Sequence, residues 1–266
     1  MARDYLKERL YVREQTLPFF DYLMSSVLSE NARFLLDTLM QKTEVYIFSG
    51  VIRNFLLGFT ENRDMDIVVA DLDAVSFDYP ELKECSVSRN SFGGYKAVID
   101  DVYIDIWSLN TTWGIQVRNM RRNPYSLIKT AFFNFSAIVF DLKKKRFICD
   151  DGFCSFLRTR TMDVVLPENP NITLCILNTI YYAKKYKFPL SYRLCAWVRK
   201  HYDETLPFED VELAHFHKSV VSTDDRMWFN SIVSFLIDGN YFMRSQNASF
   251  DFVQKKIEIN SLEPNF

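Results

Sequence analysis

Short apolar runs alternate with helical patterns through the first part of the chain. An apolar run over 45–48 ends at Ser49 and Gly50, and the residues that follow have the apolar spacing of a helix as far as Gly58. A second apolar run follows over 65–69. Runs of this length are typical of strands, and a glycine commonly follows the last turn of a helix. The pattern therefore predicts a strand, a glycine turn, a helix and a second strand.

The residues before this segment, 1–42, have the spacing of two helices. The second helix is predicted from Ser29, a residue type that suits an N-cap, to Lys42. Its apolar stripe consists of Phe34, Leu35, Leu36 and Leu39. We expect this segment to pack against the sheet, and a helix that binds a partner protein is the alternative.

The chain becomes helical after about residue 166. Apolar positions recur at helical spacing over 171–185 and 191–201, and more weakly over 211–242. The first of these helices ends in interleaved aromatic and basic residues, namely Tyr181, Tyr182, Lys184, Lys185, Tyr186 and Lys187. Such a set can stack bases and hold phosphates. Tyrosines at helical spacing are more often part of a core, and we favour that interpretation.

Two aspartates open the second predicted strand. Because side-chain direction repeats every two residues in a strand, Asp64 and Asp66 should lie on one face, roughly 7 Å apart. Two carboxylates there can converge on Mg²⁺, which typically combines one or two carboxylates with substrate phosphates. The spacing alone is a weak signal, since Asp71 and Asp73 repeat it without a glycine turn and a helix before them. We interpret that second pair as a loop or a helix cap.

A third aspartate lies inside an apolar run over 102–107. Burying an acid among β-branched and aromatic residues costs free energy unless the acid is paired or binds a metal. We therefore expect Asp105 to join Asp64 and Asp66. An edge strand on which Asp105 faces water is the alternative.

The composition narrows the class of protein. A chain of 266 residues with 48% apolar residues can bury one large core or two modest ones. Its net charge of −2 gives no overall attraction to nucleic acid, so contacts with a polynucleotide must come from local basic clusters. The basic run over 143–146 is one such cluster, although its pattern is first of all that of a hairpin tip.

The cysteines and the start of the chain indicate a compartment. Five cysteines at unrelated spacings favour a reduced protein over a disulfide framework, and zinc is not expected because no CxxC pair occurs. We interpret Cys149 and Cys154 as structural. The first residues lack the apolar core of a signal peptide, and no run approaches the roughly 18 apolar residues of a membrane span. We expect a soluble protein of the cytoplasm with no membrane partner.

One stretch resembles the GGxVRDxxLG…DxD signature of the poly(A) polymerase and CCA-adding head domain, a branch of the DNA polymerase β-like nucleotidyltransferases: Ser49-Gly50-x-x-Arg53-Asn54-x-Leu56-Leu57-Gly58, followed by Asp64-x-Asp66. The resemblance covers about 43–190. It implies an α+β fold in which a mixed sheet flanked by helices is followed by a helical C-terminal domain. The implied parts are N-terminal helices over 1–42, a catalytic domain over 43–160, and a helical neck and C-terminal domain over 161–266.

The resemblance also implies a role for each candidate site residue. Asp64, Asp66 and Asp105 match the catalytic carboxylates, which bind two Mg²⁺ ions, with Mn²⁺ as the alternative, and Asp105 acts on the attacking hydroxyl. A second stretch, 118–152, resembles the RRDFTxNA…DLxxGxxxDxxGG part of the same domain. The implied ligands of the nucleotide, including the turn at the helix N-terminus, are Ser49, Gly50, Arg53, Arg121, Arg122 and Asn123.

A glycine pair and the two arginines each have a plainer interpretation than a contact with the nucleotide. Gly93 and Gly94 separate two β-prone runs and predict a hairpin turn, which we favour over a close passage of the chain past a nucleotide. Arg121 and Arg122 are, without the resemblance, a basic pair at the start of a helix and exposed to solvent.

The chain departs from the family pattern in ways that affect recognition. Asn123 stands where the family has aspartate, so the resemblance leaves sugar recognition open. Asn54 likewise replaces the aspartate of the first signature. Ile172 and Cys175 occupy neck positions at which CCA-adding enzymes place the arginines that read the incoming base. A protein-templated choice of C and A is therefore not expected.

We predict an enzyme, a metal-dependent nucleotidyltransferase that moves a nucleoside monophosphate from a nucleoside triphosphate to an acceptor hydroxyl at the 3′ end of a tRNA-like RNA. Alternatives with the same chemistry are defence-associated (antiviral) synthesis of oligonucleotides and nucleotidylation of a protein hydroxyl. An alternative of another class is a catalytically idle copy that serves as an antitoxin or binding partner. A protein partner or an oligomer is compatible with each of these.

Overall fold

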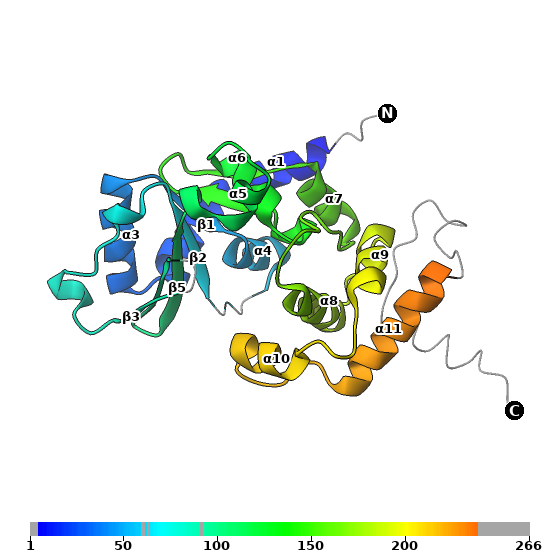
Figure 1. The fold of residues 1–266 in the computed structure, drawn as a ribbon. Coiled ribbons are helices and arrows are strands. Elements are labelled where there is room, and N and C mark those ends of the chain that lie inside the picture. Colours follow the sequence, from blue (N-terminus) through cyan, green and yellow to red (C-terminus); the bar gives the residue numbers. More distant parts are fainter. Residues whose placement is uncertain (1–4, 60–61, 63, 91–92, 239–266) are drawn as a thin grey trace, which may run out of the picture. The chain divides into compact units, whose positions relative to one another are not determined.

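The structure is a computed structural model that describes residues 5–59, 62, 64–90 and 93–238. The chain divides into two compact units (Figure 1). The first unit comprises residues 1–131 and 135–158, and the second comprises residues 132–134 and 159–266.

The first unit is built on a seven-stranded sheet with the order β3-β4-β5-β2-β1-β6-β7. Its strands are β1 (Val45–Phe48), β2 (Met65–Val69), β3 (Ser86–Arg89), β4 (Tyr95–Ile99), β5 (Val102–Ser108), β6 (Ile138–Asp141) and β7 (Arg146–Cys149). β2 and β5 run parallel, and all the other neighbouring strands are antiparallel. The sheet is therefore mixed, as predicted.

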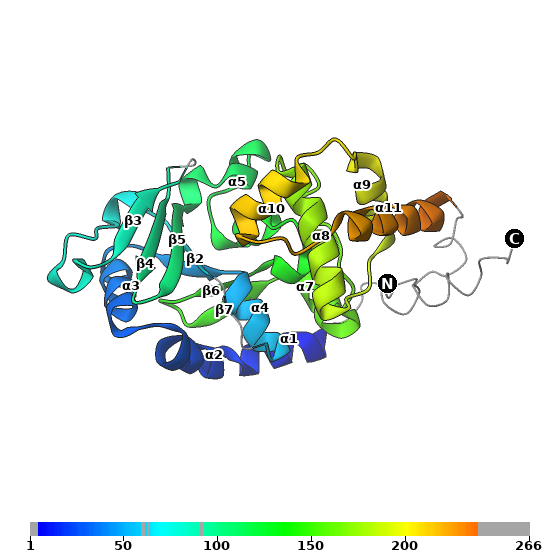
Figure 2. The same ribbon diagram turned by 90° about the horizontal axis from the view of Figure 1, so that it is seen from below.

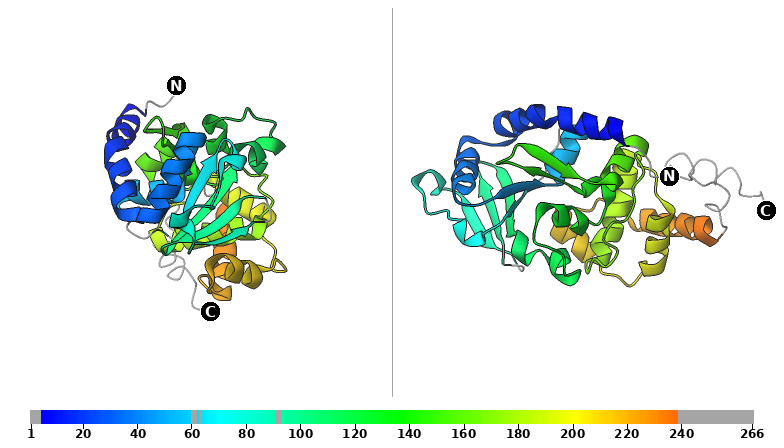
Figure 3. Two further views of the ribbon diagram at one scale, coloured as in Figure 1. Left: turned by 90° about the vertical axis from the view of Figure 1, so that its left-hand side faces the viewer. Right: turned by 90° about the horizontal axis from the view of Figure 1, so that it is seen from above.

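One face of this sheet is apolar and covered by helices. Ile47, Ile67 and Ile106 lie side by side on it and are fully buried. The helices that pack on this face are α2 (Thr16–Tyr22), α3 (Glu30–Lys42) and α4 (Gly50–Leu57), and Figure 3 shows α2 and α3, in blue, beside the strands. Because strand residues alternate between faces, Asp66 and Asp105 belong to the other face.

The N-terminal segment forms more helices than predicted. α1 (Leu6–Glu14), α2 and a π-helical turn (Leu23–Val27) precede α3, whereas the sequence predicts only one helix there. The prediction for α3 is confirmed. The Ser29 hydroxyl accepts a hydrogen bond from the Ala32 backbone N–H at 3.1 Å, and the predicted apolar stripe faces the core. Phe19 of α2 packs against Phe55 and Phe140, which anchors the segment on the sheet.

The predicted hairpin at the glycine pair is confirmed. β3 pairs with β4, and the Gly93 backbone has φ +82°, which favours glycine. A Cβ on Gly94 would lie 2.5 Å from the Ile106 carbonyl oxygen, so a side chain there would clash with β5. The close approach that requires a glycine is thus to the neighbouring strand.

The rest of the first unit connects and extends the sheet. Residues 142–145 form the turn between β6 and β7, which confirms the predicted hairpin tip. The remaining helices are α5 (Trp113–Val117), α6 (Pro124–Leu127) and α7 (Asp151–Thr159). Short 3-10 turns lie at Leu72–Ala74, Pro80–Leu82, Leu109–Thr111, Ile128–Thr130 and Asn134–Ser136.

The second unit is helical in the part that the structure describes. It contains α8 (Ile172–Tyr186), α9 (Tyr192–His201), α10 (Phe208–Phe216) and α11 (Thr223–Asp238), and α9 packs against α11 (Figure 2). The weak helical pattern after 211 is split in two. The buried carboxylate of Glu212, on α10, accepts hydrogen bonds from the backbone N–H groups of Val220 and Val221. These bonds hold the loop between α10 and α11. Residues 239–242 of that pattern lie outside the described residues.

The aromatic residues of α8 belong largely to the packing of the second unit. Tyr182 stacks on Tyr186 with ring centroids 5.8 Å apart, and Phe133 meets Tyr182 edge to face. All the tyrosines of the cluster are half-buried. Trp197 is 6% exposed and donates from Nε1 to the Pro167 carbonyl. These contacts support the core interpretation of the cluster.

The cysteines are free, and no long apolar helix occurs in the described part of the chain. All five thiols are unpaired by disulfides. Cys149 and Cys154 share a hydrogen bond between their thiols, which together with burial raises the pKa of Cys149. Among the described residues, every helix is too short or too polar to cross a membrane.

Candidate active site

A single row of residues crosses the whole sheet and carries the candidate chemistry. The β2–β5 register places Asp66 directly beside Asp105, while Phe48 of β1 lies beside Asp66 and Lys96 of β4 lies beside Asp105. Neighbouring strands are roughly 4.8 Å apart. We refer to this line as the carboxylate row; from one sheet edge to the other it comprises Ser88, Lys96, Asp105, Asp66, Phe48, Val139 and Ile148.

Asp105 lies on an interior strand of the sheet. β5 has β4 on one side and β2 on the other, so the alternative of an edge strand with Asp105 facing water is wrong. Ile104 and Ile106 point into the apolar core, whereas Asp105 is partly exposed on the opposite face. The alternation of side chains along β5 therefore places the Asp105 carboxylate on the face away from the core, where it is not fully buried.

Asp64 lies just before β2. It stands two residues before Asp66 and is partly exposed, which places it at the entry to the same strand. Within the described residues, no three His, Cys, Asp or Glu side chains are grouped closely enough to hold a metal ion. The structure thus brings together Asp66 and Asp105, and the convergence of Asp64 with them stays a prediction.

The two adjacent carboxylates fit Mg²⁺. This ion usually binds one or two protein carboxylates and completes its octahedron with water and substrate phosphate oxygens. Asp66 and Asp105 supply such a pair on neighbouring strands, and both are partly exposed. A complete protein cage is not needed for a metal that arrives with a triphosphate.

The turn between β1 and α4 has an unusual backbone. Ser49 adopts φ +55° and ψ −92°, a backbone conformation that residues other than glycine rarely adopt. Its N–H donates to the Ile138 carbonyl at 3.0 Å. Gly50 follows as the first residue of α4, and apart from the adjoining residues and the backbone of the helix itself, no atom lies within 4 Å of the position that its Cβ would occupy. The N-terminus of α4 therefore begins directly after Phe48 of the carboxylate row, with open space at Gly50.

Arg53, predicted to bind phosphate, is part of a buried network. It is 6% exposed, and its Nε and Nη2 donate to the Asn54 side-chain oxygen at 3.0 and 2.9 Å. Asn54 in turn donates to Asn62, and Asn62 donates to the Tyr22 hydroxyl. Through these bonds Arg53 supports the segment that leads into Asp64.

Sequence reasoning did not identify Asn62 and Tyr22 as parts of the site. The available signal was Asn54, a polar residue on the buried side of a short apolar helix. A buried amide must find hydrogen-bond partners, which could have directed attention to the loop after α4.

The second stretch of predicted ligands lies around the start of α6. Arg121 and Arg122 are exposed, which agrees with their plainer interpretation. Asn123 has a structural task, because its side-chain oxygen accepts a hydrogen bond from the Ser126 N–H at 2.9 Å and caps α6. Phosphate binding by Arg121 and Arg122 and nucleotide binding by Asn123 stay predictions.

Two further sequence interpretations concern residues outside the row. The Asp71 carboxylate accepts from the Asp73 N–H and caps a 3-10 turn, so the second aspartate pair is a cap as expected. Ile172 begins α8, and Cys175 is buried one turn later, where burial raises the pKa of its thiol to about 12. Neither side chain offers an incoming base the several strong donors of an arginine.

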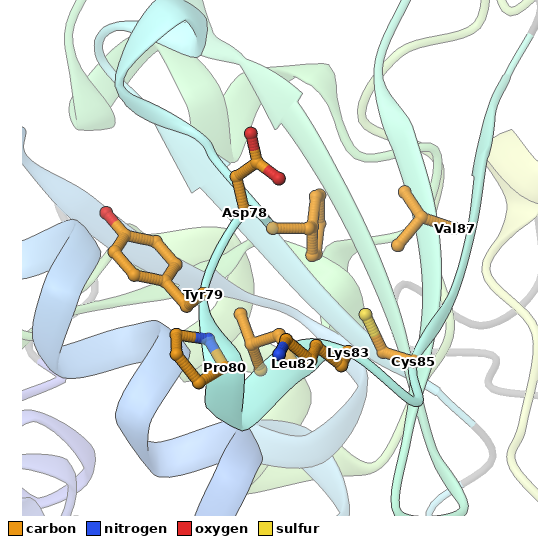
Figure 4. Close-up of a pocket in the computed structure, with 8 residues that line it drawn as sticks. Asp78, Tyr79, Pro80, Leu82, Lys83, Cys85 and Val87 are labelled. Carbon is orange, nitrogen blue, oxygen red and sulfur yellow. The ribbon is translucent and has the colours of Figure 1, made fainter.

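A described cavity lies away from the carboxylates. Its volume is about 550 Å³, and its wall runs from Phe77 to Cys85 and includes Val87 (Figure 4). Val87 pairs with the buried Ala97, so it belongs to the apolar side of the sheet, opposite the carboxylate row. The cavity is therefore separate from the candidate chemistry.

The fold is shared with solved structures of CCA-adding and tRNA-processing enzymes. A CCA-adding enzyme with CTP gives a TM-score of 0.55 at 19% identity, covering 88% of this chain and 56% of the other. A CCA-adding enzyme with ATP gives 0.54 at 17% identity, covering 88% and 55%. An apo tRNA-processing enzyme gives 0.50 at 18% identity, covering 74% and 57%.

These similarities show the fold. The chain has the α+β nucleotidyltransferase fold of the CCA-adding enzymes and spans little more than half the length of their solved structures. Neither a protein-family model nor the sequence of a curated protein matches the chain.

Proposed function

We propose that the chain is a metal-dependent nucleotidyltransferase that transfers a nucleoside monophosphate from a nucleoside triphosphate to the 3′ hydroxyl of an RNA. The observation that carries this proposal is the register that sets Asp66 beside Asp105, one strand away from the turn that begins α4. The fold shared with CCA-adding enzymes, one of them in complex with CTP, supports it.

In the proposed reaction, the acceptor oxygen forms a bond to the α-phosphorus as the bond to pyrophosphate breaks, and the hydroxyl proton is released. Mg²⁺ held by Asp64, Asp66 and Asp105 would stabilise the charge on the attacking and leaving oxygens. The Ser49 N–H already donates to the Ile138 carbonyl, so the triphosphate would be held by the backbone N–H groups from Gly50 onward, at the positive end of α4. Most of the rate enhancement then comes from positioning and electrostatics.

The order of groups along the row assigns a side to each substrate. The α4 turn follows Phe48, Asp66 comes next, and Asp105 lies beyond Asp66. A triphosphate gripped at the turn reaches the carboxylates with its α-phosphate, and the acceptor hydroxyl approaches from the side of Asp105. This order supports the assignment of Asp105 to the attacking oxygen.

We do not propose the nucleotide selection of a CCA-adding enzyme. Ile172 and the buried Cys175 lack the strong donors with which an arginine could read a base. We propose the cytoplasm as the site of action, which the five free thiols support.

The test is a transfer assay with labelled nucleotides. Purified protein is incubated with each α-³²P-labelled ribonucleoside triphosphate, Mg²⁺ and cellular RNA. The Asp64→Ala/Asp66→Ala variant serves as the inactive form, and Asp73→Asn serves as the matched control on an exposed carboxylate of the second aspartate pair. We expect label in RNA with the wild type and the control, none with the double variant, and loss of transfer after EDTA.

Other outcomes select the other hypotheses. Label in short free oligonucleotides would indicate a synthetase of signalling oligonucleotides, and label in protein would indicate nucleotidylation of a protein hydroxyl. Equal label with the wild type and the double variant would contradict the proposal and leave the idle binding partner, an interpretation that the burial of Arg53 favours.

A further inference from the structure

The face of the sheet that carries the carboxylate row is covered at one end and open at the other. Over β1 and β6, Tyr46 and Val139 are 1% and 0% exposed. Over β4 and β5, Lys96 is exposed and Tyr103 is 59% exposed. The uncovered area therefore begins directly beside Asp105.

The open area is a defined surface on neighbouring strands. Lys96 pairs with Asp105, Tyr103 lies two residues before Asp105 on the same face, and Val98 pairs with Tyr103. The edge strand continues the surface with exposed hydroxyls. We call this surface the acceptor face, and it comprises Ser86, Ser88, Lys96, Val98 and Tyr103.

The acceptor face lies at the end of the row away from the α4 turn. Phe48, which precedes the turn, and Lys96 are separated by three strand spacings, roughly 14 Å. A triphosphate bound at the turn and carboxylates at Asp66 and Asp105 occupy the space between them. Whatever supplies the attacking hydroxyl must then rest on the side of Lys96.

We propose, on the basis of the proposed function, that the acceptor face binds the last nucleotides of a single-stranded RNA. Lys96 contacts a backbone phosphate next to the terminal hydroxyl, and Tyr103 stacks on a base. Ser88 of the edge strand lies next to Lys96, and its hydroxyl donates a hydrogen bond to the following phosphate.

The chemistry of the surface favours this occupant. An exposed aromatic ring beside a cation is the combination with which proteins hold single strands without reading their sequence. The turn that joins β4 to β5 carries Asp100 and Asp101, which repel phosphates at that end. The RNA backbone is thereby directed across the strands towards the edge strand β3.

The experiment measures how tightly matched variants bind one RNA and how well they use it as the acceptor in nucleotide transfer. The probe is a 5′-fluorescein-labelled 15-mer of adenosine with a free 3′ hydroxyl. Lys96→Ala and Tyr103→Ala are compared with Lys83→Ala, which removes an exposed lysine on the segment before β3 that lines the cavity on the opposite side of the sheet. Tyr192→Ala removes a tyrosine of similar exposure on α9, and Tyr103→Phe keeps the ring.

We expect Lys96→Ala and Tyr103→Ala each to weaken binding of the 15-mer about tenfold. Lys96→Ala should also reduce the slope of log affinity against log salt by about one. The KM for RNA should rise while the KM for the nucleotide is unchanged, and Tyr103→Phe should behave as the wild type. All these side chains are exposed, so the thermal midpoints should agree.

Failure of this inference is distinct from failure of the proposed function. If Asp66→Asn abolishes transfer while Lys96→Ala and Tyr103→Ala keep the affinity and KM of the wild type for RNA, the acceptor face is wrong and the transferase stands. If the wild type transfers nothing, the function fails, and fluorescence anisotropy still reports whether the face binds RNA. Label in protein without any binding of the 15-mer would overturn the inference in favour of a protein acceptor.

Discussion

At the residue scale, the turn before α4 combines backbone strain with open space. Ser49 holds a left-handed backbone at the point where the sequence resembles a family with two glycines. Gly50, by contrast, has a conformation and surroundings that would accept a larger side chain. At Ser49 the backbone conformation costs free energy, whereas at Gly50 the space left by the missing side chain is open to a ligand. Substitutions at these two positions can therefore test the two effects separately.

Replacing Ser49 with glycine should stabilise the protein. The φ of +55° costs a serine of order 1 kcal/mol, and glycine adopts it without strain. We expect Ser49→Gly to raise the free energy of unfolding by about 1 kcal/mol, less the larger chain entropy of glycine in the unfolded state. Chemical denaturation followed by circular dichroism measures it, and a lower unfolding midpoint would show that the serine side chain contributes more than the strain.

Replacing Gly50 with alanine should impair nucleotide binding without harming the fold. Nothing lies within 4 Å of the added Cβ, and alanine suits the first turn of a helix better than glycine. We expect an unchanged or higher thermal midpoint and a KM for the nucleoside triphosphate raised roughly 10- to 100-fold, because the methyl group displaces the phosphates. An unchanged KM would mean that the triphosphate does not approach this turn.

At the element scale, two helix ends are stabilised by side chains. Asn123 caps α6, a short helix next to the exposed Arg121 and Arg122. In the second unit, Lys184 of α8 bonds the Asp225 carboxylate of α11 at 2.5 Å, and Ser222 donates to the same carboxylate. Each contact predicts an effect of substitution on stability that a role in catalysis alone would not predict.

The cap at α6 can be separated from nucleotide binding. Asn123→Ala should cost about 1 kcal/mol of stability, while Asn123→Ser keeps a capping oxygen and most of that stability. If Asn123 acts only as a cap, the KM for the nucleotide stays unchanged in Asn123→Ser. A raised KM in both variants would instead support the implied contact with the substrate. Thermal unfolding and steady-state kinetics on the same preparations make the comparison.

The bond between α8 and α11 should be sensitive to pH. Burial raises the pKa of Asp225, but hydrogen bonds from Lys184 and Ser222 outweigh it and hold the pKa below its ordinary value of 3.8. The charged form therefore contributes stability above pH 3.8, and this contribution is lost as the pH falls through the lowered pKa. We expect Asp225→Asn to cost about 1 kcal/mol at pH 7 and progressively less below pH 3.8. A cost that stays constant across this range would contradict the account.

Local elements could be predicted from the sequence more fully than their partners. The strand, turn, helix and strand around Gly50 follow from short-range patterns, as does the cap at Ser29. The register of β2 on β5 joins residues about forty positions apart in the sequence and depends on packing that no local pattern contains. The same is true of the buried Arg53, which is joined through Asn54 to Asn62 and Tyr22 by hydrogen bonds.

At the scale of the whole molecule, every carboxylate of the proposed site belongs to the first unit, with Asp66 and Asp105 in its sheet and Asp64 just before β2. The helical second unit offers Ile172 and Cys175 where the resembled family reads bases. The chain is little more than half the length of the solved structures that share its fold. We therefore ascribe the proposed chemistry to the first unit, and we expect the second unit to lack the base selection of a CCA-adding enzyme.

The central claim is that Asp105 acts together with Asp66 on the transferred phosphate. The most direct measurement is the single-turnover rate of nucleotide transfer to RNA as a function of Mg²⁺ concentration, for the wild type and for Asp66→Asn, Asp105→Asn and the control Asp73→Asn. The account predicts that the first two variants each lose at least about a thousandfold in rate and are not restored by high Mg²⁺, while the control keeps the rate of the wild type. An Asp105→Asn protein that transfers nucleotide at the rate of the wild type would contradict it.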